Sequence, residues 1–193
     1  MASRWRADNA RATAAGVGVR PAVAVDFARF TFIDFGSGMG RVLLMASRYG
    51  FKKIVGVEFS PDLHRIASNN VAVYESRLGR TTDMETVCED ATRYRIPPGP
   101  LVLFFHSPFI GRVMERVLAN ISESYAADHR SIILIFHGKN PRSIEMFEAL
   151  GFSETELELR PDWTRFISYR SIVFTSPQVL EAGGVEGDSG IRA

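Results

Sequence analysis

Three glycines at alternate positions follow an acidic residue in the first quarter of the chain. The acid is Asp34, and the glycines are Gly36, Gly38 and Gly40. Glycine allows positive φ angles in a tight turn, and its missing Cβ lets the backbone approach a ligand closely. A carboxylate beside this turn would repel a pyrophosphate but could pair with a cationic amino group. The spacing favours a positively charged ligand, although an ordinary strand-to-helix turn would explain the glycines equally well.

The segments on either side of the glycines predict a strand and a helix. Residues 30–35 are apolar and β-prone, and residues 41–49 are good helix formers that end at Gly50, a favourable C-cap. Further strands that alternate with helices predict an α/β fold, in which a doubly wound, mostly parallel sheet carries helices on both faces. The other predicted strands are 53–58, 86–90, 101–105 and 131–136, and the other predicted helices are 61–76, 113–121 and 140–150.

The alternation changes after Gly151. Residues 152–159 and 166–174 are strand-like and no helix separates them, which predicts a closing antiparallel β-hairpin. With the acidic glycine motif in 32–41 and the Val-Glu-Phe-Ser-Pro stretch in 57–61, the chain resembles the class I (seven-β-strand) S-adenosylmethionine (SAM) methyltransferases, including uncharacterised bacterial members. The resemblance implies a seven-stranded sheet in the order 3-2-1-4-5-7-6 and SAM as the cofactor.

Acids at three strand ends are the expected cofactor contacts, because ligands of such sheets bind at the carboxyl ends of the strands. We expect Glu58 to accept hydrogen bonds from a ribose diol, and Asp90 to accept from an adenine amino group beside the small Ala91. Phe59 would lie along the adenine face. Each acid could instead be a helix cap or a solvated loop residue. The expected cofactor-binding residues are Asp34, Gly36, Ser37, Gly38, Gly40, Glu58, Phe59, Asp90 and Ala91.

The stretch after the predicted fourth strand carries the information on the methyl acceptor. It reads His106, Ser107, Pro108 and Phe109, and we expect the last three residues to face the acceptor. Methyltransferases that act on nitrogen often have an Asn- or Asp-Pro-Pro-Tyr or an Asn-Pro-Phe motif at this point. Ser107 stands in place of the Asn, and its hydroxyl cannot copy the paired donor and acceptor of an amide. His106 and Ser107 are the catalytic candidates; His106 could be a general base or a packing residue.

Composition and charge limit the other function classes. The chain has 193 residues, of which 46% are hydrophobic, and a formal net charge of +1. This charge gives no strong nucleic-acid or anionic-membrane signal and leaves only local patches. No apolar run is long enough to cross a membrane, and the four histidines lack metal-ligand spacing, so no metal site is expected. The single cysteine, Cys88, suits a cytoplasmic protein and is expected to be buried in a strand.

We expect one SAM-binding domain over 30–176, with a partly flexible extension over 1–29 and a disordered tail over 177–193. The predicted function is methyl transfer from SAM to an unidentified acceptor, either a small molecule or a protein. The alternative is a non-catalytic SAM-binding interaction module, because the acceptor motif is altered and few residues precede the first strand. Asp34, the glycine spacing and the hairpin disfavour a nicotinamide-dependent oxidoreductase. The sequence does not predict the oligomeric state.

Overall fold

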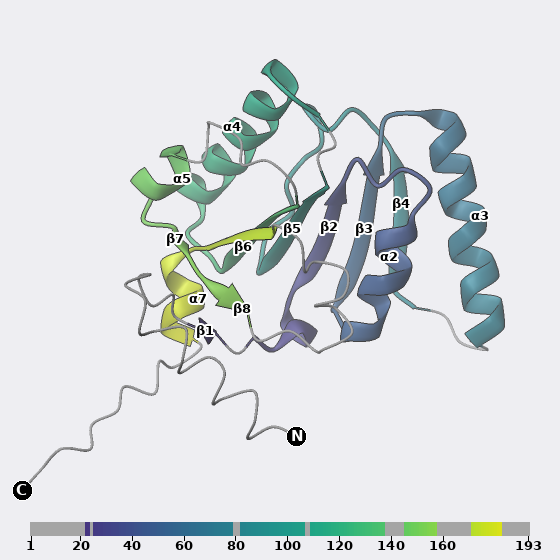
Figure 1. Cartoon of the computed structure of the whole chain (residues 1–193), viewed down its shortest axis with the longest axis horizontal. Coiled ribbons are helices and arrows are strands. Elements are labelled where there is room, and N and C mark those ends of the chain that lie inside the picture. Colours follow the sequence, from purple (N-terminus) through teal and green to yellow (C-terminus); the bar gives the residue numbers. More distant parts are fainter. Residues whose placement is uncertain are drawn as a thin grey trace, which may run out of the picture.

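A mixed sheet of seven strands forms the centre of the molecule (Figure 1). The computed structural model describes residues 22–23, 25–78, 82–106, 109–137, 145–157 and 171–182. The strands lie in the order β4-β3-β2-β5-β6-β9-β7, so the predicted order 3-2-1-4-5-7-6 is confirmed. The strands are β2 (Thr31–Phe35), β3 (Lys53–Glu58), β4 (Met84–Cys88), β5 (Leu101–His106), β6 (Ile132–His137), β7 (Ser153–Glu154) and β9 (Ser171–Thr175).

The first five strands of this sheet are parallel, and the last two close it in the antiparallel sense. β2 pairs with β3 on one side and with β5 on the other, so the strand order reverses between β2 and β5. β9 runs antiparallel to both β6 and β7. The carboxyl ends of the parallel strands therefore lie along one edge of the sheet, which is where such folds bind their ligands.

Helices cover both faces of the sheet, as the alternating pattern predicts (Figure 1). One apolar layer packs the helices α4 and α5 against side chains such as Phe35 and Phe105. The other layer packs α2, α3 and α7 against side chains such as Phe32 and Ile133. The helices are α2 (Arg41–Ala46), α3 (Pro61–Leu78), α4 (Arg112–Ala127), α5 (Glu145–Ala149) and α7 (Pro177–Ala182). Among the described helices, none has the length and apolarity of a membrane span.

The local start and stop signals act as the sequence predicts. The short 3-10 helix η3 (Ser47–Tyr49) extends α2 and ends at Gly50, which has a left-handed conformation. Pro61 opens α3, and the Ser60 hydroxyl accepts a hydrogen bond from the Leu63 amide at 3.5 Å. Both residues fit the usual chemistry of helix starts.

The closing hairpin differs from the prediction in its first strand. The expected strand over 152–159 is divided at Thr155: β7 pairs with β9, whereas β8 (Glu156–Leu157) pairs in parallel with β1 (Ala22–Val23). The Thr155 amide still donates to the Val173 carbonyl at 2.9 Å, so the chain leaves the main sheet only after this residue. Part of the 1–29 extension thus forms a second, two-stranded sheet. Residues 158–170 lie outside the described part of the chain.

Two further expectations are wrong. The predicted disordered tail begins with α7, whose Val179 is buried against the β6 layer, while residues 183–193 lie outside the described part. Val179 and the partly buried Leu180 suffice to hold α7 in place, because they cover the face of the sheet beside β6. Cys88 is exposed rather than buried, because β4 is the edge strand.

Candidate functional site

Three stacked aromatic rings form the last buried layer of the sheet before its carboxyl edge. Phe35, Phe105 and Phe136 are register partners on β2, β5 and β6. Their ring centroids are 5.2 Å and 4.9 Å apart, with nearly parallel planes. All three are fully buried. The residues that follow each ring, Gly36, His106 and His137, therefore leave the sheet from a rigid, dry base.

The glycine loop follows β2 and has the geometry that its sequence predicts. Gly36, Gly38 and Gly40 all have positive φ angles. A Cβ at Gly38 would meet nothing within 4 Å, whereas one at Gly40 would lie 3.1 Å from the Cβ of Ala67 on α3. The two glycines therefore serve different ends. Gly38 leaves open space beside the backbone, and Gly40 lets the start of α2 pack against α3.

Glu58, at the end of β3, is fixed to this loop by its carboxylate. Oε2 accepts from the Gly38 amide at 2.8 Å, and Oε1 accepts from the Ser60 amide at 2.9 Å. A carboxylate has about four acceptor positions, so these two bonds leave others for a ligand. The amide side chain of Asn70 on α3 also donates to the Met39 carbonyl at 2.9 Å, which ties the loop to α3.

Asp34 lies beneath the loop with only 2% of its surface exposed. Burial, and to a smaller extent the nearby charge of Glu58, raises the pKa of Asp34 to about 8. Both effects disfavour a second negative charge at this edge. In the free protein Asp34 is therefore largely protonated near neutral pH, and a cation placed beside it would favour the ionised form.

Ser37 contributes to the loop differently from the other expected residues. Its side chain is turned inward, where its Oγ would lie 2.8 Å from a Cβ at Gly56 of β3. This Oγ is buried and has no hydrogen-bond partner among the described atoms. The Ser37 amide donates to the Val57 carbonyl at 3.1 Å and its carbonyl accepts from the Gly40 amide at 2.9 Å, so Ser37 holds the shape of the loop while its side chain packs under it.

Phe59 directly follows β3, whereas Asp90 and Ala91 lie beyond the end of β4, because this strand covers Met84–Cys88 and not the predicted 86–90. One oxygen of Asp90 accepts from the Thr92 amide and from the Thr92 hydroxyl, both at 2.8 Å. These bonds, with a smaller effect of Arg93, lower the pKa of Asp90. Ala91 is buried, whereas 73% of the Phe59 surface is exposed. An ionised acceptor, a small residue and an uncovered aromatic ring thus border the same edge.

On the acceptor side, two histidines lie next to each other. His106 ends β5 and His137 ends β6, and they are register partners whose ring centroids are 4.5 Å apart. Burial and the neighbouring His106 lower the pKa of His137. Phe109 is half-buried and packs against the α4 layer. Ser107 and Pro108 lie outside the described residues.

Comparison with known proteins identifies the fold. No protein-family model and no curated protein matches the sequence. Magnesium protoporphyrin IX methyltransferase from Synechocystis PCC 6803, solved with bound SAM, is 16% identical, with a TM-score of 0.50 over 90% of this chain and 78% of that one. A putative SAM-dependent methyltransferase from Listeria monocytogenes is 13% identical, with a TM-score of 0.51 over 79% of this chain and 92% of that one. The chain has the class I methyltransferase fold.

Within this class I methyltransferase fold, His137 is a site residue that the sequence did not single out. His137 follows an apolar run as His106 does, and aligning these two predicted parallel strands would have placed the histidines side by side. The inward turn of Ser37 depends on the missing side chain at Gly56, which the loop sequence alone does not show. No group of three or more His, Cys, Asp or Glu side chains in the described ranges could hold a metal ion.

Proposed function

We propose that the protein binds SAM at the carboxyl edge of β2, β3 and β4 and transfers its methyl group to an acceptor. The observation that carries this proposal is the position of the Glu58 carboxylate, held by the Gly38 and Ser60 amides at the mouth of the glycine loop. Its remaining acceptor positions suit a pair of ribose hydroxyls. The SAM bound to the Synechocystis enzyme of the same fold supports this proposal.

The residues at this edge match the parts of SAM by their chemistry. Asp34 offers a carboxyl group to the cationic amino group, and the open space at Gly38 admits a ligand close to the backbone. Asp90 keeps acceptor capacity for an adenine amino group beside Ala91. The exposed Phe59 ring can cover the adenine face and would itself be shielded from water.

The protein aligns the two reactants, and it does not need to activate the methyl group. SAM, when bound, supplies a methyl group on a sulfonium that is already activated for transfer. The anchored Glu58 and the loop fix one reactant, and the ends of β5 and β6 border the place for the other. Holding two reactants in line can supply about 7–11 kcal/mol of the barrier reduction.

The histidine pair supports an acceptor that loses a proton during transfer. His106 is exposed at the end of β5, so its ring can reach an acceptor bound at this edge. The neighbouring His137, 4.5 Å away between ring centroids, has a pKa lowered by burial and by His106, so its neutral form is favoured. A neutral imidazole can take a proton from a hydroxyl, thiol or amine. We assign His106 as the candidate general base because its exposed ring lies at the end of β5, next to the place for the acceptor.

Calorimetry with single variants tests the cofactor part of the proposal. Glu58→Ala should weaken S-adenosylhomocysteine binding by about 1–3 kcal/mol, because it removes hydrogen-bond acceptors for the ligand. The matched control is Glu85→Ala on β4, which removes a carboxylate that is half exposed and paired with Lys53, away from the glycine loop. Thermal unfolding of the free variants checks that the loop still folds. Unchanged affinity in Glu58→Ala would show that Glu58 is structural.

Incubation with methyl-labelled SAM and a cell extract tests the transfer. We expect label to appear in a product, and we expect His106→Ala to reduce that labelling more than it reduces S-adenosylhomocysteine binding. Binding of SAM with no labelled product would favour a binding module without catalysis.

A further inference from the structure

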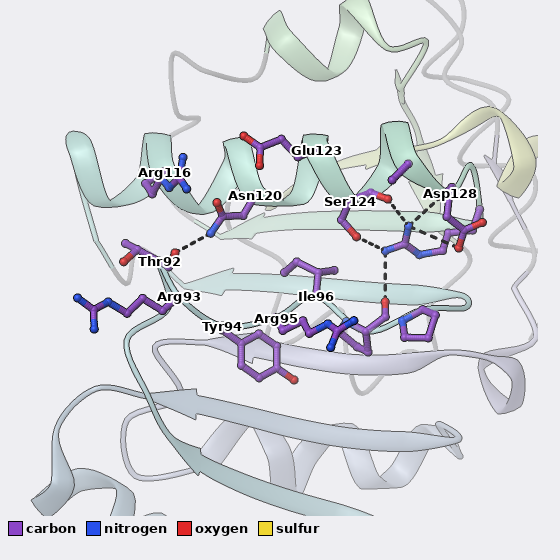
Figure 2. A pocket seen from close by; sticks show the side chains of 14 residues that line it. Thr92, Arg93, Tyr94, Arg95, Ile96, Arg116, Asn120, Glu123, Ser124 and Asp128 are labelled. Carbon is purple, nitrogen blue, oxygen red and sulfur yellow. Dashed lines mark hydrogen bonds and ion pairs between the residues drawn. The ribbon is translucent and has the colours of Figure 1, made fainter.

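An open cavity of about 1020 Å³ lies beside the proposed cofactor site, between α4 and the segment that joins β4 to β5 (Figure 2). One wall is the segment 92–98, and the other is the α4 face that carries Arg116, Asn120 and Glu123. We call this cavity the arginine groove. Its volume is in the range of ligand sites, although the glycine loop does not contribute to it.

Three arginines line the groove and extend into solvent. Arg93 and Arg95 are exposed, while Tyr94 and Ile96 between them are half-buried and pack on the core. Arg93 ends a turn in which its own amide and that of Tyr94 donate to the Asp90 carbonyl at 2.9 Å and 3.1 Å, and Arg95 follows two residues later on the same wall. Arg116 comes from the opposite wall. None of the three forms an ion pair with a described residue.

The walls of the groove are fixed in place. At one end, Asn120 donates from its side chain to the Thr92 carbonyl at 2.7 Å, and Arg93 and Arg116 lie on either side of this bond (Figure 2). In the middle of the groove, the Tyr94 ring packs edge-on against the Phe35 ring, with the two ring centroids 5.9 Å apart. The arginines therefore extend from a rigid frame, which lowers the entropy that a ligand would have to remove.

A buried arginine closes the other end. Arg130 is 8% exposed and donates five hydrogen bonds, to the carbonyls of Pro97, Gly99, Ser124 and Asp128 and to the Ser124 hydroxyl. These bonds join the 92–98 wall to the end of α4, so Arg130 has a structural role in the groove.

The carboxylates in and next to the groove offset only part of its positive charge. Asp128 lies 3.9 Å from Arg130, a cation that is already committed to the frame. Glu123 is the other acid of the lining. Asp90, just outside the lining, attracts Arg93, so the three exposed arginines face Glu123 and Asp90 and keep an excess of positive charge.

We propose that the arginine groove binds a ligand that carries two or more phosphate groups. Guanidinium groups present planar pairs of donors that match phosphate oxygens, and two of them repeat along one wall with a third opposite. A single carboxylate would engage only one of these positions, whereas a polyphosphate or a phosphodiester chain would engage several. This site is separate from the proposed cofactor site.

Binding of two phosphate probes to the full chain tests the proposal. The probes are inorganic tripolyphosphate, measured by calorimetry, and a fluorescent single-stranded RNA oligonucleotide, measured by anisotropy. The double variant Arg95→Gln/Arg116→Gln should bind at least one probe about tenfold or more weakly. For the oligonucleotide, the slope of log affinity against log salt should fall by about 1.4, since single strands contribute about 0.7 per phosphate contact.

A matched control carries the same change of charge on another face. Arg65→Gln/Arg77→Gln removes two exposed arginines of α3 and should leave both affinities within about twofold of wild type. Glu123→Gln should strengthen binding. Binding of tripolyphosphate alone would identify a small phosphate ligand, and binding of the oligonucleotide alone would identify a nucleic-acid backbone.

Two results would overturn the proposal. One is the absence of binding of either probe to the wild type at low salt. The other is an equal loss in the groove variant and the α3 control, which would indicate general charge attraction. S-adenosylhomocysteine affinity, measured on the same samples, should be unchanged in the groove variant. If neither the wild type nor the variants bind S-adenosylhomocysteine, that result contradicts the proposed function and leaves the test of the groove unaffected.

Discussion

At the scale of residues, the buried carboxyl group of Asp34 links the proposed site to the stability of the folded protein. The fold buries this carboxyl group and places Glu58 close enough for its charge to oppose ionisation. A buried acid without a cation is a poor contributor to stability, but it is a favourable partner for a cationic ligand group. The acid of the motif was predictable from the sequence. Its burial was not, because that depends on how the loop folds over the end of β2.

The raised pKa of Asp34 predicts a pH dependence of stability. The unfolded carboxyl group titrates near 3.8 and the folded one at about 8. Between these values the unfolded chain has lost the proton that the folded protein still holds, so stability falls as pH rises, by up to about 1.4 kcal/mol per pH unit. Urea unfolding at several pH values measures this slope. Asp34→Asn should be less dependent on pH over the same range, and an identical slope in both proteins would contradict the assignment.

At the scale of elements, the glycine loop divides its work between a ligand and the packing of helices. Its strand–turn–helix order follows from apolar patterning and from residues such as Gly50, and the sequence predicts it well. Which glycine faces the open side and which faces α3 could not be predicted, because Ala67 is distant in the sequence. The same reason explains why the sequence did not reveal the inward turn of Ser37.

Alanine substitutions in the loop should separate these two roles. Both Gly38→Ala and Gly40→Ala place a Cβ at positive φ, which costs about 1–2 kcal/mol. Gly40→Ala should destabilise the fold further, because its Cβ would lie 3.1 Å from that of the buried Ala67. Urea unfolding compares the two variants. If Gly38→Ala lost as much stability as Gly40→Ala or more, the contact between α2 and α3 would not be what requires a glycine at position 40.

At the scale of the whole molecule, the last described helix completes one apolar layer. The Ser176 hydroxyl accepts from the Ile132 amide and donates to the Arg130 carbonyl, both at 3.0 Å, so the chain before α7 is tied to the start of β6. Val179 then packs into the layer formed with α2 and α3. Composition alone predicted disorder here, since a helix of six residues has too weak a periodicity to stand out.

Val179→Ala tests whether α7 belongs to the cooperative fold. We expect a loss of about 1–2 kcal/mol in the free energy of unfolding, because Val179 is 3% exposed and its removal leaves a cavity. Val73→Ala is the matched control, since Val73 is 42% exposed on α3 and should matter little. Equal stability of the two variants would mean that α7 frays independently of the core.

The order of the sheet was the most predictable property of the molecule. Apolar strands that alternate with helices predict the parallel part, and the missing helix after Gly151 predicts the antiparallel closure, while the order itself is what the resemblance to class I methyltransferases implies. The pairing of β8 with β1 could not be predicted, because each strand has two residues and no periodic pattern. The exposed Cys88 follows from the edge position of β4, which the strand's own composition does not indicate.

Calorimetric titration of the free protein with S-adenosylhomocysteine and, separately, with NADH tests the central claim most directly. The Glu58 carboxylate, which already accepts from the Gly38 amide, predicts saturable binding of the adenosyl compound and no binding of the dinucleotide, because a pyrophosphate would meet this charge and find that amide occupied. The largely protonated Asp34 beneath the loop would become ionised beside the cationic amino group of the adenosyl compound. Binding of NADH without binding of S-adenosylhomocysteine would contradict the proposed SAM site.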